Sequence, residues 1–140
     1  MLKEALKPLD LEPDAINWLC SLYEVIQFID DVQDGDKADI ESGVWNSIVF
    51  LPTNRFFLRN AQYLSPVLSI QILKWMASDE RERDGKADAK TYMYRAGFYD
   101  VVMEVVLLTH GYKKAKYYAP IVMDIYGETL KDYLEEFKDA

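Results

Sequence analysis

The chain has 140 residues, of which 50% are hydrophobic and 29% charged, so an ordinary folded core is expected without disulfides or metal ions. Its 24 acidic and 16 basic side chains give a net charge of −8, and no run of Lys and Arg exceeds two residues. Nucleic-acid and anionic-membrane binding are therefore not expected. An aromatic content of 14%, with ten tyrosines, excludes intrinsic disorder over most of the length.

The N-terminus and the cysteine content favour a cytoplasmic protein. The first residues, MLKEALKPLD, carry charges where a signal peptide needs an apolar core, and no stretch approaches the length of a membrane span. Cys20 is the only cysteine and lies in an apolar run, which rules out an internal disulfide and favours a reducing compartment. We interpret Cys20 as a small buried hydrophobic residue.

The beginning of the chain shows helical periodicity, and alternating strand patterns are scarce. A short amphipathic helix is predicted over residues 1–7, closed by Pro8. A long helix is predicted over residues 13–34, because Pro13 suits a first-turn position and Gly35 suits a C-terminal stop.

A third helix is predicted between Asp36, which is expected to cap it, and Pro52, before which it ends. Its apolar residues recur every four positions, at Ile40, Val44 and Ile48. Thr53 and Asn54 are expected to start a short helix through residues 57 and 58.

The middle of the chain begins with Ser65 and Pro66, a cap followed by a first-turn proline. They predict a helix that buries Leu68, Ile72, Trp75 and Met76. The polar stretch 78–90 is interpreted as a frayed helix end followed by a solvated loop.

The last two predicted helices cover residues 91–111 and 112–137. Pro120 and Gly127 interrupt the second, and Pro120 is expected to kink or break it. These elements together predict an all-α protein, a single domain over residues 1–140 built as a bundle of six or seven helices.

The first acidic cluster lies in Leu22–Asp36, LYEVIQFIDDVQDGD, where apolar side chains occupy one side of the predicted helix. The acidic side chains on the opposite face or at its edge are Glu24, Asp30, Asp31 and Asp34. The simplest interpretation is the solvated side of an amphipathic helix.

The position of these acids along the helix favours a second interpretation. Asp30, Asp31, Asp34 and Asp36 crowd a helix C-terminus, where each costs about 0.3–1 kcal/mol, and Lys37 is the only nearby cation. A divalent cation, or a Lys or Arg from another helix, would relieve this repulsion. Carboxylate oxygens suit Mg²⁺ or Ca²⁺.

The second acidic cluster lies in Tyr92–His110, which is apolar on nearly all sides and is therefore expected to be central. Asp100 and Glu104 lie one turn apart on it. A buried carboxylate must pair with a cation, take up a proton or bind a metal. The candidate cations for a structural ion pair are Arg55, Arg59 and Arg95, although Arg95 projects to the far side of its own helix.

The string LY at 22–23 followed by DDVQD at 30–34 resembles the first aspartate-rich DDxxD region of all-α isoprenoid synthases of the squalene/phytoene type. That resemblance implies Mg²⁺ ions, held by Asp30, Asp31 and Asp34, that grip the diphosphate of an allylic substrate. Asp100-x-x-x-Glu104 is similar in spacing to the second acidic motif of that family. The overall layout, including LPTNRFF, THG and YGETLKDYLEEF, also resembles small proteins of tailed bacteriophages.

Other motifs narrow the possible chemistry. All-α nucleotide pyrophosphohydrolases also face carboxylates across Mg²⁺, but their ExxE and ExxD pairs are absent here, as are glycine-rich phosphate loops and GxSxG. His110 is the only histidine, which removes His-based zinc sites, and it precedes Gly111, where we expect it to cap a helix. No residue is assigned a catalytic role.

Two functional hypotheses follow. In the first, the protein is a Mg²⁺-dependent domain for a diphosphate-containing small molecule. The predicted metal ligands are Glu24, Asp30, Asp31 and Asp34 from one helix and Asp100 and Glu104 from a facing helix. In the second, it is a non-enzymatic, phage-encoded interaction or assembly protein whose acidic face binds a basic partner.

The C-terminal helices are rich in tyrosine, which is enriched at interfaces, and they predict a packing surface or a homo-oligomer contact. The tyrosines are Tyr112, Tyr117, Tyr118, Tyr126 and Tyr133, and the lysines beside them are Lys113, Lys114 and Lys116. A small anion-contacting patch is the alternative.

Overall fold

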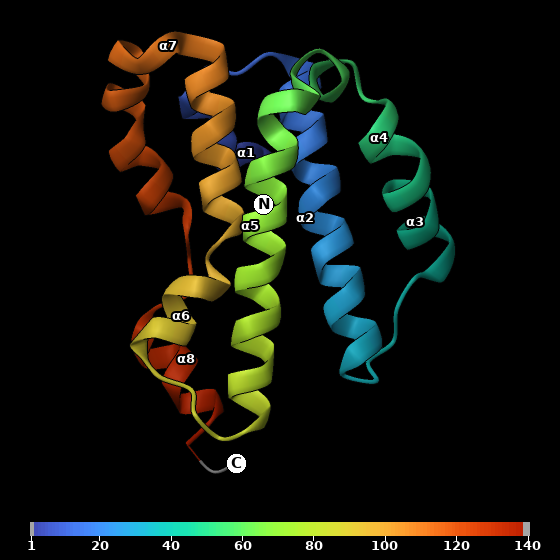
Figure 1. The fold of residues 1–140 in the computed structure, drawn as a ribbon, viewed down its shortest axis with the longest axis vertical. Helices are drawn as coiled ribbons and strands as arrows, with labels where there is room; N and C mark the ends of the chain where they lie inside the picture. The colour runs from blue at the N-terminus through green and yellow to red at the C-terminus, as the bar shows by residue number, and fades with distance from the viewer. Residues whose placement is uncertain (1, 139–140) are drawn as a thin grey trace. The chain divides into compact units, whose positions relative to one another are not determined.

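The computed structural model describes residues 2–138, and the regular structure within that range is entirely helical (Figure 1). The predicted all-α class is confirmed. The chain divides into two compact units, residues 1–61 and residues 62–140, which we call the N-terminal and the C-terminal unit. A single domain over residues 1–140 stays a prediction. No helix within residues 2–138 combines the length and the apolar character that crossing a membrane requires.

The N-terminal unit consists of a long helix, α2, and several short helical elements. In chain order they are α1 (Leu2–Leu6), η1 (Lys7–Leu9), α2 (Pro13–Gln33), α3 (Ile40–Val44), η2 (Trp45–Phe50), α4 (Leu51–Thr53) and the start of α5 (Arg55–Arg83). η1 is a 3-10 turn and η2 is a π-helical turn. The buried Trp18 ring stacks on Phe57 at 5.4 Å, and the Asn54 side chain donates to the Asp14 carbonyl (3.0 Å), so the starts of α2 and α5 are joined.

The C-terminal end of α2 matches the prediction. Gly35 adopts a φ of +73°, a left-handed conformation that favours glycine. The N–H groups of Gly35 and Asp36 donate to the carbonyls of Val32 (3.3 Å) and Asp31 (2.9 Å). This paired arrangement satisfies the last carbonyls of the helix and stops it.

The run from α3 to α4 differs from the predicted helix at both ends. Asp36 belongs to the end of α2, and Asp39 is the residue that caps α3, by accepting from the Ser42 N–H (3.1 Å). The run does not end before Pro52, which lies in the first turn of α4, where a missing N–H is tolerated.

The C-terminal unit contains most of α5, followed by α6 (Ala89–Arg95), α7 (Phe98–Ile125) and α8 (Leu130–Glu136). Asp88 and Thr91 cap α6 reciprocally, and Thr129 caps α8 by accepting from the Asp132 N–H (3.1 Å). The stretch 78–90 contains a helix end followed by a loop, as predicted, because α5 continues to Arg83 and α6 begins at Ala89.

The predicted start of a helix at Ser65 and Pro66 is wrong. α5 is already running there, capped by Asn54, which accepts from the Phe57 N–H (3.1 Å). Its irregular point is Asn60, with φ −123° and ψ 15°.

The predicted buried face of this helix is also wrong. Ile72 and Met76 are exposed, and Leu68 and Trp75 are only partly buried. The buried side chains of α5 in the C-terminal unit are Leu64, Gln71, Ser78 and Glu82.

The predicted helix over 91–111 is interrupted at residues 96–97, between α6 and α7. A Cβ on Gly97 would lie 3.3 Å from the Gln71 side chain, so the absence of a side chain allows this close approach. The expected stop at Gly111 is present, with φ +76° and ψ +165°, a conformation reached almost only by glycine. The chain reverses there, and the two halves of α7 form a helical hairpin (Figure 1). The helix then passes through Pro120 and stops at residues 126–129.

Candidate functional site

The four predicted metal ligands of the N-terminal unit lie in the second half of α2 and at its C-cap, Asp34. Glu24 accepts a hydrogen bond from the Asn46 side chain (3.0 Å), so at least one of its oxygens already holds η2 against α2. Asp30 and Asp31 are partly buried, and Asp34 is exposed. Asp30 and Asp31 are thus less exposed than Val32, which belongs to the predicted apolar side, and Glu24 has a structural contact.

The two predicted ligands of the C-terminal unit lie on an amphipathic helix and not on one that is buried all round. Asp100 is exposed, whereas Val101, Val102 and Val105 are buried. Asp100 accepts from Lys74 Nζ at 2.8 Å, in an ion pair between α5 and α7. The expectation that Asp100 is a buried carboxylate is therefore wrong, because the opposite side of α7 supplies the core.

Two of the three arginines proposed as partners of Asp100 have other contacts. Arg59 pairs with Glu12 in the N-terminal unit, and Arg95 pairs with Glu82. The ion-pair alternative is thus supported for Asp100, with Lys74 as the cation.

Divalent-cation binding requires several converging oxygen ligands. Within residues 2–138 there is no group of three or more His, Cys, Asp or Glu side chains placed to hold a metal ion. Four of the six predicted ligands belong to the N-terminal unit and two to the C-terminal unit. Their joint role in binding Mg²⁺ stays a prediction.

The C-terminal unit contains a buried polar cluster that sequence reasoning did not identify. Glu82 receives two hydrogen bonds from Arg95 (both 2.7 Å) and one from the Tyr133 hydroxyl (2.5 Å), which also lies 2.8 Å from Thr91 Oγ1. Ser78 donates to the Thr91 carbonyl (3.3 Å). This cluster joins α5, α6 and α8, and it explains why the buried row of α5 is polar.

The electrostatics of this cluster indicate a structural role. Burial, and then the hydrogen bond to the Glu82 carboxylate, raise the pKa of Tyr133 far above its ordinary value. The positive charge of Arg95 compensates the negative charge of Glu82, as a buried carboxylate requires. The hydroxyl of Tyr133 therefore stays protonated and acts as a hydrogen-bond donor.

Cys20 lies in the N-terminal unit and His110 in the C-terminal unit. Cys20 is partly buried, and burial followed by the charge of Glu24 raises the pKa of its thiol, which disfavours the nucleophilic thiolate. The His110 ring stacks on Tyr118 at 4.5 Å and so connects the two halves of the α7 hairpin.

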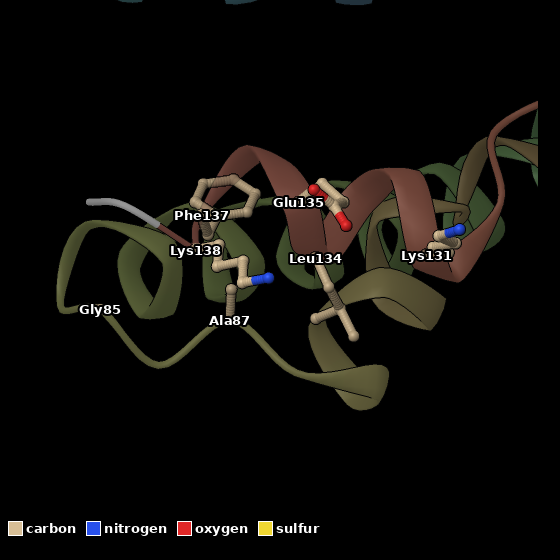
Figure 2. A pocket seen from close by; sticks show the side chains of 7 residues that line it. All are labelled: Gly85, Ala87, Lys131, Leu134, Glu135, Phe137 and Lys138. Carbon is tan, nitrogen blue, oxygen red and sulfur yellow. The ribbon is translucent and has the colours of Figure 1, made fainter.

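A shallow hollow of about 390 Å³ lies beside α8 in the C-terminal unit (Figure 2). Leu134 and Phe137 line it together with Ala87, and Lys131, Glu135 and Lys138 lie at the same surface. Its lysines and glutamate are exposed, so it lacks a buried polar side chain that would orient a small molecule.

The most unusual surface of the N-terminal unit is on the run 40–50. Five of its six large apolar side chains are between 43% and 67% exposed, and the sixth, Val49, is partly buried. The five exposed ones are Ile40, Val44, Trp45, Ile48 and Phe50, and we call them the outward face. The Trp45 and Phe50 rings lie 6.1 Å apart, so this face includes an aromatic pair.

The opposite side of the run makes the contacts with α2. Gly43 and Asn46 are buried there. A Cβ on Gly43 would lie 2.4 Å from ring carbons of Phe28, and the Asn46 amide is bonded to Glu24. The run therefore docks through a glycine and an amide and presents its apolar residues outward, the reverse of an ordinary amphipathic helix.

Carboxylates are concentrated near the start of this run. The pairs Gly43–Phe28 and Asn46–Glu24 show that the run lies antiparallel to α2, so its start is next to the acidic end of α2. Residues 24–54 contain seven acidic side chains and one lysine, a net charge of −6. The acids are Glu24, Asp30, Asp31, Asp34, Asp36, Asp39 and Glu41.

Comparisons with family models, with curated proteins and with solved structures found no match, so the resemblances to isoprenoid synthases and to phage proteins stay predictions.

Proposed function

We propose that this protein is a non-catalytic interaction domain whose outward face binds a basic, amphipathic segment of a partner protein. The observation that carries the proposal is the inverted orientation of residues 40–50, in which Gly43 and Asn46 face α2 and Trp45 and Ile48 face solvent. In this proposal the carboxylates at the end of α2 guide the partner and are not metal ligands.

The apolar part of the surface supplies the affinity. Covering apolar area is worth about 25 cal/mol per Å², and contiguous exposed apolar patches on soluble proteins mark interaction sites. Ile40, Val44 and Ile48 recur every four residues, so they form a ridge that a partner helix can pack against. Trp45 and Phe50 add aromatic anchors, the residue types that dominate binding energy at interfaces.

The charged rim supplies selectivity. A surface with a local charge of −6 repels acidic segments and speeds the encounter with basic ones. An apolar surface with an acidic border thus matches a helix that carries apolar residues on one face and Lys or Arg at its margins.

The proposal is tested with a designed amphipathic peptide of Leu and Lys and a second peptide in which Glu replaces Lys. We expect the Lys peptide to bind and to shift the fluorescence of the exposed Trp45, and the Glu peptide to bind far more weakly. Ile48→Glu should weaken Lys-peptide binding by about tenfold or more. Since this variant adds a negative charge, purely electrostatic binding would become stronger.

The matched control is Ile70→Glu, the same change at a residue of α5 that is 54% exposed and lies outside the outward face. It should bind the Lys peptide like the unaltered chain. Equal binding by Ile48→Glu and Ile70→Glu would overturn the proposal.

A further inference from the structure

The second half of the α7 hairpin presents a surface whose chemistry complements the outward face. On residues 112–125 the buried side includes Val122, while Tyr112, Tyr117 and Met123 are 72–74% exposed. The exposed side chains are Tyr112, Lys113, Lys114, Lys116, Tyr117, Pro120, Met123 and Asp124. We call the surface formed by Tyr112, Lys113, Lys116, Tyr117, Pro120 and Met123 the basic face, and Asp124 lies beside it. The basic face extends from Tyr112 to Met123, and twelve residues of α-helix span about 18 Å, or roughly three turns.

The charge of this surface is opposite to that of the chain as a whole. Between Glu104 and Asp124 there are three lysines and no acidic residue. Lys113 and Lys116 are exposed, and each is adjacent in the sequence to an exposed tyrosine, Tyr112 or Tyr117. This is the combination of Lys, aromatic and Met side chains that an apolar surface with an acidic rim would accept.

We infer that the partner of the outward face is the basic face of a second copy of this chain, so that copies associate head to tail. The inference rests on the proposed function and names its partner. Tyr112, Tyr117 and Met123 cover the apolar ridge, and Lys113 and Lys116 meet the carboxylates around it. The Trp45 ring also offers its face to a lysine ammonium.

This pairing joins two different surfaces, and each copy offers one of each. Such a contact produces a ring where the rotation closes and a filament where it does not. The local charges of −6 over residues 24–54 and +2 over residues 112–125 attract each other, although two whole chains of charge −8 repel. The pairing therefore depends on these two faces and not on nonspecific association.

The experiment follows the sedimentation velocity of the full chain from micromolar to near-millimolar concentration. We expect the unaltered chain to associate with rising concentration. Lys113→Glu/Lys116→Glu and Ile48→Glu should each stay monomeric, because each lacks one of the two faces. Far-UV circular dichroism should be unchanged, since all three residues are exposed.

Mixing the two variants gives the sharpest outcome. The lysine variant keeps its outward face and Ile48→Glu keeps its basic face, so an equimolar mixture should form heterodimers and nothing larger. The matched control is Lys86→Glu/Lys90→Glu, the same charge change at exposed lysines outside the basic face, which should associate like the unaltered chain.

The possible failures are distinguishable. A chain that stays monomeric at all concentrations but binds the Leu/Lys peptide overturns this inference and leaves the proposed function standing. A chain that neither associates nor binds the peptide overturns both. Association that survives in the lysine variant also overturns the inference, because it must use another surface.

Discussion

Gly43 shows how one residue without a side chain orients a whole segment. Its Cα approaches the Phe28 ring so closely that a Cβ would lie 2.4 Å from ring carbons. An aromatic ring on a packed helix cannot bend away as the end of a lysine can. The closeness of this contact keeps Trp45 and Ile48 facing outward.

Gly43→Ala is therefore expected to lower the free energy of unfolding by about 1–3 kcal/mol, the usual cost of overpacking. Urea unfolding followed by circular dichroism measures it. Gly127→Ala is the matched control, since a Cβ there has no atom within 4 Å and should bring no such loss. Equal stability of the two variants would show that the run does not depend on this contact.

Glu136 provides a pH-dependent contribution to stability. Partial desolvation of its carboxyl group, and then the nearby carboxylate of Glu128, raise the pKa of the exposed Glu136 above its ordinary value of 4.5. A raised pKa means that the folded state binds this proton more tightly than the unfolded state does. The contribution is present at pH below 4.5 and is lost as the pH rises through the raised value.

We expect Glu136→Gln to remove this loss, so that its free energy of unfolding falls less than that of the unaltered chain as the pH rises from 4.5 to neutrality. Chemical unfolding at several pH values measures the difference. Glu135→Gln, at the adjacent position, should keep the behaviour of the unaltered chain. If the free energy of unfolding changed equally with pH for Glu136→Gln and for the unaltered chain, the prediction would be contradicted.

At the scale of the element, α8 is short and depends on Tyr133 for its attachment. The Tyr133 ring is buried, and its hydroxyl donates to Glu82 of α5. A seven-residue helix is not stable alone, so this contact and the rings around it hold α8 in place.

Tyr133→Phe should lower the free energy of unfolding by about 1–3 kcal/mol, because it leaves a buried carboxylate with one hydrogen-bond donor fewer. Tyr112→Phe, the same change at an exposed ring, should have no measurable effect. Thermal unfolding of the two variants tests the difference. A Tyr133→Phe variant as stable as the unaltered chain would mean that the hydroxyl contributes nothing.

Some features of the helices depend only on residues nearby in the sequence, and others depend on distant residues. The ends of α2 and the stop at Gly111 were predictable, because Pro13, Gly35 and Gly111 act through their own backbone preferences. The buried face of α5 was not predictable, because both of its sides carry apolar residues. The choice depends on Glu82 meeting Arg95 and Tyr133, far along the chain.

At the scale of the whole molecule, the acidic character of α2 was predictable and its surroundings were not. Spacing places Asp31 and Asp34 on the polar side of the helix. The outward orientation of the neighbouring run follows from contacts of Gly43 and Asn46 with α2, which no local pattern specifies. Helical periodicity assigns Ile48 to one face of a helix, but it does not show whether that face is buried or exposed to solvent.

The metal hypothesis leads to a prediction for the whole chain. Since Asp100 pairs with Lys74, and since residues 2–138 gather no set of three potential ligands, we expect millimolar Mg²⁺ or Mn²⁺ to leave Tm unchanged relative to EDTA. Differential scanning calorimetry measures this. A rise in Tm with metal, abolished by both Asp31→Asn and Asp100→Asn, would instead support metal binding.

The backbone at Gly111 has a stereochemical consequence. The mirror image of its φ and ψ, about −76° and −165°, lies close to the extended region that L-residues prefer. A D-alanine introduced there by chemical ligation would therefore accept the reversal without strain, whereas L-alanine would oppose it. The direction in which Tyr112 and the helix after it leave the turn thus depends on one achiral α-carbon.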